Sequence, residues 1–177
     1  AETMSNYLFA IGNEKDLNEL KLSIEPEQDE TTSTITLKHI SKRNWVLVIE
    51  NKRPHIRTSI SDQCKPYAGV FFKGWFEDHI NSSIVIGKHG IEKYHSSLKM
   101  SKSFSKPIDK EGAFVLASWT KKAVTVQNDL YSSFPIVFCN TDRIFLASDS
   151  LLLISHCRKT LGIPCKLNER IAIGKAW

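Results

Sequence analysis

The sequence lacks any run of about 18 consecutive apolar residues, so it offers no candidate for a membrane-spanning helix. Its N-terminus also lacks the basic stretch followed by an apolar core that is typical of a signal peptide. These two absences predict a cytoplasmic protein with no membrane partner.

Cysteines are few, and their spacing matches no metal-binding motif. Cys64, Cys139, Cys157 and Cys165 form neither a Cys-x-x-Cys pair nor a Cys/His zinc pattern. Cys139 lies in an apolar strand-like run and Cys157 in a helix-like one, where a buried free thiol is the simplest expectation. A reducing compartment suits such thiols, and the sequence predicts no metal site.

The excess of positive charge is small and is not concentrated anywhere. The sequence holds 24 Lys and Arg residues against 19 Asp and Glu residues, a formal net charge of +5. The basic residues are scattered and no recognised nucleic-acid motif accompanies them, so we expect no nucleic-acid partner. The 177 residues contain no internal repeat and no low-complexity segment. Residues 1–177 therefore fit a single domain with its own core.

Apolar runs of strand length dominate the sequence. Some alternate with period two, as half-buried strands do, and others are dense enough for a central strand. Gly74 interrupts one of these runs. Many strands with few helices favour an α+β fold built in layers. The strand-like runs are residues 7–11, 34–40, 45–49, 68–76, 112–119, 124–138 and 144–149, and residues 83–87 fit either a strand or a strand-to-helix corner.

Helical patterns are fewer and lie mostly late in the chain. Residues 14–24 fit a helix or a loop, residues 90–98 fit a helix, and residues 167–177 fit the start of another. The strongest helix signal follows residue 148, where three small polar residues are N-cap candidates, and it ends at Gly162, which is a C-cap residue. The cap candidates are Ser148, Asp149 and Ser150, and Leu152, Leu153, His156 and Thr160 follow at helical spacing.

Residues 112–149 match a known pattern at several points. A strand opens at Gly112, a turn carries Asp129 and Pro135, and a last strand ends at Ser148. In this order they resemble the glutaminase-like domain at the N-terminus of asparagine synthetase-type enzymes. That family has a Gly-x-Phe-Ala strand, an Arg-Asp turn closed by Pro-Leu, and a Phe-x-x-Ser-Glu strand end. The resemblance implies an Ntn-type fold, a four-layer αββα sandwich of two antiparallel sheets flanked by helices, with Asp129 and Pro135 as structural residues of the turn.

The resemblance also implies where a nucleophile would lie. Ntn glutaminases attack the substrate amide with the first residue of the mature chain and use its α-amine as general base. The family has a cysteine there, but this chain begins Ala-Glu-Thr-Met-Ser and has no cysteine before Cys64. Removal of Met4 as a natural initiator would expose Ser5. Ser5 is therefore the candidate nucleophile by position.

The other implied site residues depart from the family pattern. The family segment Phe-Asn-Gly-Glu corresponds to residues 72–75, which read Phe-Lys-Gly-Trp. Gly74 is retained, and its N–H is the candidate oxyanion donor. Lys73 replaces the Asn, and Trp75 replaces a Glu that helps to place the substrate. Arg57 is the candidate partner of a substrate carboxylate, and the segment expected to bind the substrate ammonium contains no carboxylate.

These departures favour a degenerate site. We expect a non-catalytic glutamine amidotransferase-like domain of an asparagine synthetase-like protein that forms amide bonds with ATP, as in β-lactam synthetases and lasso-peptide cyclases. The sequence contains no Ser-Gly-Gly-x-Asp-Ser loop. ATP and Mg²⁺ would therefore bind to a synthetase domain beyond residue 177 or on another chain, and this domain would need no cofactor of its own.

Two alternatives stay open. The chain fits an active Ser-dependent Ntn amidohydrolase in which Ser5 is the nucleophile and Gly74 an oxyanion donor. It also fits a binding module with an aromatic surface, although core packing explains the same aromatic residues. The sequence is also compatible with a homodimer. The aromatic residues are Phe71, Phe72, Trp75 and Phe76, and strand alternation would place Phe72 and Phe76 on one face and Phe71 and Trp75 on the other.

Overall fold

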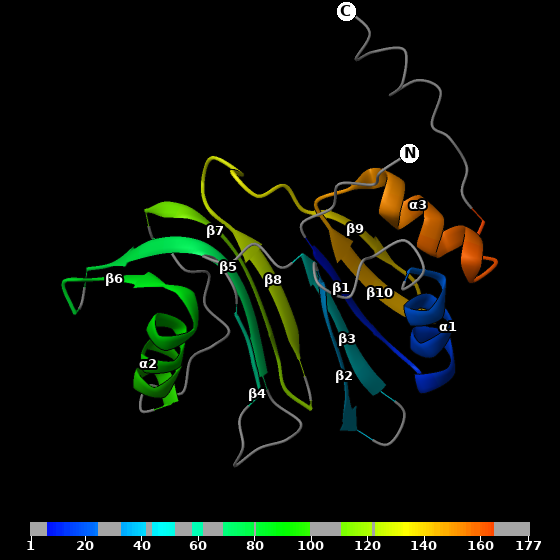
Figure 1. Cartoon of the computed structure of the whole chain (residues 1–177), viewed down its shortest axis with the longest axis horizontal. Coiled ribbons are helices and arrows are strands. Elements are labelled where there is room, and N and C mark those ends of the chain that lie inside the picture. The colour runs from blue at the N-terminus through cyan, green and yellow to red at the C-terminus, as the bar shows by residue number, and fades with distance from the viewer. Residues whose placement is uncertain are drawn as a thin grey trace, which may run out of the picture.

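The strands form two antiparallel sheets that lie face to face (Figure 1). Within the described residues the protein is α+β, with ten strands and three helices. The α+β class expected from the sequence is thus confirmed. The computed structural model describes residues 7–24, 33–41, 44–51, 58–61, 69–79, 81–99, 111–121 and 123–164.

The first sheet has the strand order β2-β3-β1-β10-β9. β1 is its central strand and pairs with β3 on one side and β10 on the other. Four consecutive residues of β1 are buried, because a strand covered on both faces presents alternate side chains to two cores. The strands are β1 (Tyr7–Gly12), β2 (Ser33–Ser41), β3 (Asn44–Asn51), β9 (Val137–Asn140) and β10 (Ile144–Ser148).

The second sheet has the order β4-β5-β7-β8, with β6 also paired to β5. β7 runs along one edge of β5. Along the other edge, β4 pairs with residues 69–72 of β5 and β6 pairs with residues 75–78. The strands are β4 (Thr58–Ser61), β5 (Gly69–Asp78), β6 (Ser83–Ile86), β7 (Gly112–Trp119) and β8 (Val124–Asn128).

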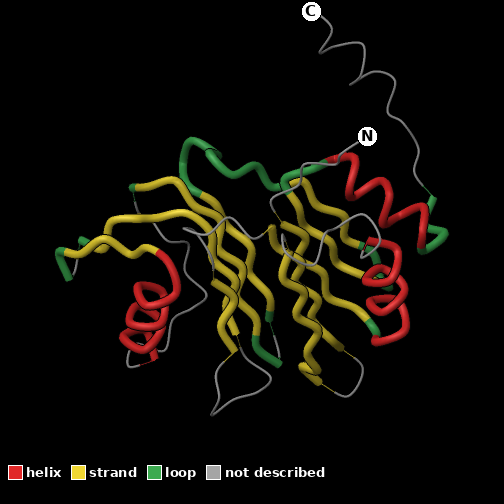
Figure 2. Tube along the Cα trace, viewed as in Figure 1, coloured by secondary structure: helices red, strands yellow, loops and turns green. Residues whose placement is uncertain are grey.

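Helices cover the outer faces of the two sheets (Figure 2). Helices α1 (Glu14–Ile24) and α3 (Leu151–Thr160) pack on the first sheet, and α2 (Gly87–Lys99) packs on the second. A third apolar cluster lies between the sheets, where the rings of Phe9 and Trp119 are 5.7 Å apart. Alternate residues of each inner strand therefore serve different cores.

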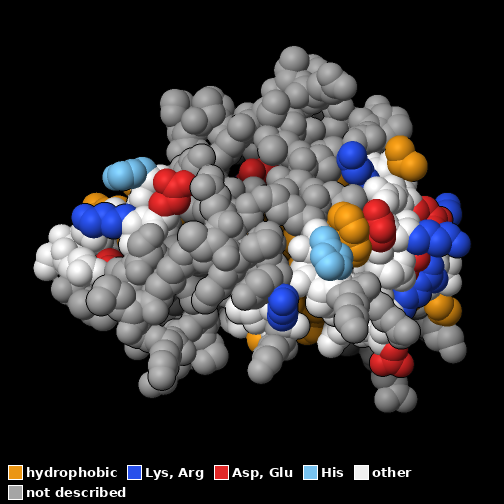
Figure 3. Space-filling model, turned by 90° about the horizontal axis from the view of Figure 1, so that it is seen from below, with side chains coloured by type: hydrophobic (Ala, Val, Ile, Leu, Met, Phe, Trp, Pro, Cys, Tyr) orange, Lys and Arg blue, Asp and Glu red, His pale blue; other side chains and the backbone are white. Residues whose placement is uncertain are grey.

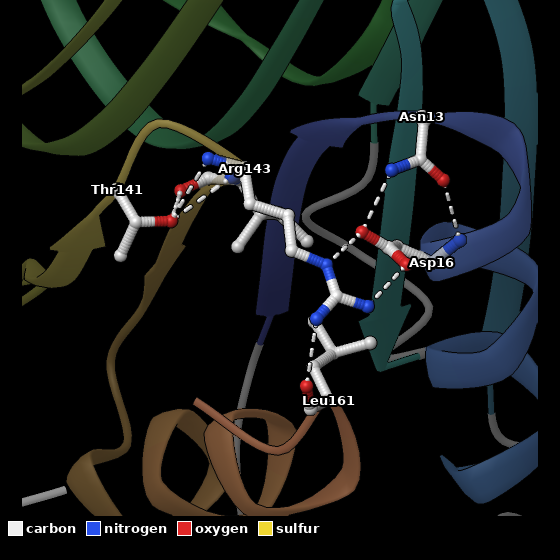
Figure 4. A network of polar contacts seen from close by, with 6 residues as sticks. Asn13, Asp16, Thr141, Arg143 and Leu161 are labelled. Atoms are coloured by element: carbon white, nitrogen blue, oxygen red, sulfur yellow. Dashed lines mark hydrogen bonds and ion pairs between the residues drawn. The ribbon is translucent and has the colours of Figure 1, made fainter. Parts of the chain in front are cut away.

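A polar clamp joins the start of α1 to the end of α3 (Figure 4). Asp16 is buried in the first turn of α1 and accepts hydrogen bonds from Nε and Nη2 of Arg143, both at 2.6 Å. Nη1 of Arg143 donates to the carbonyl of Leu161 at 2.9 Å. Asn13 caps α1, because its Oδ1 accepts from the Asp16 N–H at 2.9 Å and its Nδ2 donates to the Asp16 carboxylate at 2.7 Å. One arginine thus holds two helices that are distant in sequence.

Several sequence predictions are confirmed. Of the two readings left open for residues 14–24, the helix is correct. Both readings of residues 83–87 apply, because β6 ends at Ile86 and α2 begins at the next residue. Gly74 does not end β5, although its φ angle is +97°. Cys139 and Cys157 are buried and free, and burial raises the pKa of the Cys157 thiol to about 12. Strands cover or overlap the runs 7–11, 34–40, 45–49, 68–76, 112–119 and 144–149.

The last helix confirms its predicted caps and one part of its predicted face. Ser150 is the N-cap, and its Oγ accepts from the Leu153 N–H at 3.2 Å. Gly162 follows the C-cap with a φ of +65° and donates its N–H to the carbonyl of Lys159. The predicted face included Leu152, which is 68% exposed. Leu153 was also predicted and is buried, and the other buried residues of the helix are Ile154 and Cys157.

Other segments differ from the prediction or lie outside the described residues. The run 124–138 is not one strand, because β8 belongs to the second sheet and β9 to the first. β4 was not predicted. The predicted loop at 101–110 and the predicted helix at 167–177 lie outside the described residues. In the part of the chain that is described, no helix has the length and apolar character needed to cross a membrane.

Candidate functional site

Buried polar side chains gather between the sheets at the N-terminal end of β1. Tyr7 and Glu50 are direct partners in the pairing of β1 with β3. The Tyr7 ring lies 5.5 Å from the ring of Phe71 on the opposite sheet. Lys73 is two residues after Phe71 on β5, so it shares the inward face, and it is only 5% exposed. A carboxyl, a phenol and an amine are therefore buried at one end of the central core.

Tyr7 connects this end of the core to the loop between β8 and β9. Its Oη donates to the carbonyl of Pro135 at 3.0 Å. Its own carbonyl accepts from Oγ of Ser148 at 2.7 Å. Burial, and in second place the negative charge of Asp149, raises the pKa of Tyr7 above the ordinary tyrosine value. Tyr7 is therefore a neutral hydrogen-bond donor at physiological pH.

Asp129 organises the turn that leads to Pro135. Its carboxylate accepts hydrogen bonds from the N–H groups of Phe114, Tyr131 and Ser133, each at 3.1 Å, and from Oγ of Ser133 at 3.0 Å. Burial alone would raise the pKa of Asp129, but the bonds from Ser133 and Phe114 outweigh it and lower the pKa. The structure therefore gives Asp129 the geometry of a buried turn anchor and places Pro135 against Tyr7.

Lys73 and Gly74 lie at a break in the pairing of β5. The residues of β5 that pair with β4 end at Phe72, and the residues of β5 that pair with β6 begin at Trp75. A Cβ atom added at Gly74 would lie 1.9 Å from the carbonyl oxygen of Ala113, and the φ of +97° also disfavours a side chain. Only glycine fits this close approach of β5 to β7. If the Gly74 N–H were an oxyanion donor, it would have to reach the substrate through the gap between β4 and β6.

Trp75 lies on an exposed part of the second sheet, formed by the ends of β5 and β6, rather than in the central core. It is 43% exposed and is the cross-strand partner of Ile86, which is also exposed. The other three aromatic residues that the sequence associated with a binding surface are buried. Phe71 packs between the sheets, whereas Phe72 and Phe76 pack under α2, as strand alternation predicts. An exposed aromatic surface on β5 is thus reduced to Trp75.

Two of the predicted site residues lie outside the described residues, namely Ser5 and Arg57. Sequence reasoning singled out neither Tyr7 nor Glu50. The only signal for them was position, because Tyr7 opens one apolar run and Glu50 follows another. Their meeting depends on the pairing of β1 with β3, which no local pattern specifies.

A second group of side chains was missed as well. Glu77, His79 and Glu111 each offer a ligand atom, and these atoms lie within 4.8 Å of one another. All three side chains are exposed. Glu77 and His79 are two residues apart at the end of β5, a spacing that places two strand side chains on one face. Glu111 joins them only because β7 pairs with β5.

The coloured side chains in Figure 3 show positive and negative residues interspersed, most densely over the end of the molecule that carries α1. Lys and Arg side chains form no continuous patch on the described part of this face. No protein-family model, no curated protein and no solved structure matches the chain.

Proposed function

We propose that the chain is a non-catalytic, Ntn-type glutamine amidotransferase-like domain that serves an ATP-dependent, amide-forming synthetase domain. The support from the fold is the succession of helices, sheet, sheet and helix, with the first described strand at the centre of its sheet. This succession is compatible with an αββα sandwich. In the proposal the domain has a structural role, such as docking on the synthetase domain and shaping its substrate entry.

The observation that carries the proposal is the filling of the core beside β1. A glutaminase needs room between its sheets for an amino acid substrate. Here the rings of Tyr7 and Phe71 are in contact, and the buried amine of Lys73 follows on the same face. The site is therefore suited to packing rather than to binding glutamine.

The proposal assigns the chemistry to the synthetase domain. That domain, on the same chain or on another, would bind ATP and Mg²⁺ and form the amide bond in the cytoplasm. No described residue of this chain is proposed to hold a nucleotide. Intact mass of the protein isolated from its natural source tests the covalent form, because a fused synthetase domain predicts a mass several-fold above 20.1 kDa.

Ammonia release from glutamine tests the loss of glutaminase activity. The protein should be prepared with Ser5 as its first residue, so that the free α-amine is available to a serine nucleophile. We expect no release above the uncatalysed rate. Hydrolysis that is abolished by Ser5→Ala would overturn the proposal and establish the Ser-dependent amidohydrolase instead. Hydrolysis that survives Ser5→Ala would identify a contaminating enzyme. Ammonia release would then be measured again after further purification, and its disappearance would support the proposal.

A further inference from the structure

The cluster of Glu77, His79 and Glu111 has a donor set that suits a transition metal. It combines one imidazole with two carboxylates, and Oε1 of Glu77 lies 3.9 Å from Nδ1 of His79. Imidazole nitrogen with carboxylate oxygen is a common ligand set for zinc and for other first-row divalent metals. Calcium and magnesium prefer oxygen ligands alone. The histidine therefore distinguishes this cluster from a merely acidic surface.

The backbone holds the three ligands in register. The N–H of Glu77 donates to the carbonyl of Glu111 at 2.8 Å, so Glu111, the residue before β7, is fixed beside Glu77 of β5. Along β5, Trp75 and Glu77 are exposed while Phe76 and Asp78 are buried, and His79 continues the exposed series. Glu77 is therefore held within β5, and His79 and Glu111 directly adjoin the ends of β5 and β7, which favours a defined geometry.

The electrostatics favour a cation at the same place. Carboxylates that are direct neighbours on paired strands repel each other. A divalent cation between Glu77 and Glu111 would replace this repulsion with two attractions. Zinc bonds of about 2.0 to 2.2 Å require the ligand atoms to lie closer together than the 3.9 Å between Oε1 of Glu77 and Nδ1 of His79. Small rotations of exposed side chains close such a difference.

We propose that Glu77, His79 and Glu111 bind one Zn²⁺ ion, with water completing its coordination. This inference is independent of the proposed function, because the site lies on the exposed part of the second sheet beside Trp75 and not between the sheets. Three protein ligands with an open position are the arrangement of zinc sites that accept a further ligand. The ion would therefore offer an attachment point for a partner's carboxylate or imidazole.

Calorimetric titration of the full chain with Zn²⁺ tests the site. We expect one ion per chain, and we expect His79→Ala and Glu111→Gln each to weaken binding at least about tenfold. His89→Ala is the matched control, because His89 is an exposed histidine on α2 outside the cluster. It should leave the affinity unchanged. Circular dichroism should show that all variants are folded.

Trp75 supplies a second readout. It shares its face of β5 with Glu77, so Ni²⁺ or Cu²⁺ in the site should quench its fluorescence, and this quenching should disappear in Trp75→Phe and in His79→Ala. The proposal is overturned if the full chain binds no Zn²⁺. It is equally overturned if His79→Ala and His89→Ala bind Zn²⁺ as the unaltered protein does, since binding would then be adventitious.

Discussion

The hydroxyl of Tyr7 donates a hydrogen bond to the carbonyl of Pro135 at 3.0 Å, across 128 positions of the chain. Tyr7 begins the central strand of the first sheet, and Pro135 lies in the loop that carries the chain from β8 in the second sheet to β9 in the first. The bond therefore links the start of β1 to the loop that connects the two sheets. Tyr7 and Pro135 bear on the proposed function, because they help to close the space beside β1.

Tyr7→Phe removes this donor while keeping the ring that packs on Phe71. We expect the free energy of unfolding to fall by about 1 kcal/mol, the usual net effect of losing one partly buried hydrogen bond. Urea denaturation measures the change. Tyr131→Phe is the matched control, since the Tyr131 side chain is 85% exposed and should contribute little. Equal losses in the two variants would contradict the importance of the contact.

The raised pKa of Tyr7 predicts a dependence of stability on alkaline pH. A group whose pKa is higher in the folded state stabilises the fold fully below its unfolded pKa, here about 10, and this stabilisation is lost as the pH rises through the folded pKa. The free energy of unfolding should therefore begin to fall at about pH 10 and should keep falling as the pH rises toward the folded pKa. Burial also raises the pKa of Tyr94, so the difference between the unaltered protein and Tyr7→Phe isolates the Tyr7 contribution. Parallel curves for the two proteins would refute this prediction.

Asp129→Asn tests the anchor of the β8–β9 turn. An amide nitrogen would replace one oxygen that now accepts from the N–H groups of Tyr131 and Ser133, so we expect a loss of about 2 kcal/mol. The lowered pKa of Asp129 means that its contribution is present above about pH 4 and is lost as the pH falls through the folded pKa. Acid denaturation should therefore be less steep in the variant. Asp142→Asn, at an exposed turn residue, should behave as the unaltered protein.

The sequence predicted those features that depend on neighbouring residues. Dense apolar runs such as 45–49 are strands, because their side chains serve cores on both faces. Ser150 is a cap, because its Oγ bonds to a residue three positions along. The face of α3 was not predictable in this way. Leu152 and Leu153 both lie at helical spacing, and only the packing of α3 on α1 and the first sheet selects Leu153.

The candidate site was less predictable because it is assembled by pairing between strands. Asp129 was identified by resemblance, but its bond to the Phe114 N–H exists only because the turn after β8 folds back on β7. Glu111 reaches Glu77 through the register of β7 with β5. A shift of that register by one residue would turn Glu111 to the opposite face. Such contacts are tertiary, and no local pattern contains them.

Arg143 variants test the clamp between α1 and α3. Arg143→Ala leaves the buried Asp16 carboxylate without its two-bond partner, and Arg143→Lys restores the charge without the fork. We expect the urea midpoint to fall most in Arg143→Ala and less in Arg143→Lys. The hydrogen bonds from Arg143 are the main cause of the lowered pKa of Asp16, so the difference between proteins should shrink as the pH falls below about 4. Lys93→Ala, an exposed change on α2, is the control and should not move the midpoint.

Gly74→Ala tests the close approach of β5 to β7, and Gly162→Ala is its matched control. Both glycines have positive φ angles, so both variants carry the cost of a side chain in that region, about 1 to 2 kcal/mol. A Cβ at Gly162 meets nothing within 4 Å, whereas a Cβ at Gly74 would overlap the carbonyl of Ala113. Gly74→Ala should therefore lower the urea midpoint much further, because β7 must move or the pairing must break. If the two variants lose equal stability, strain at φ alone accounts for Gly74, and the break between β4 and β6 owes nothing to the contact with β7.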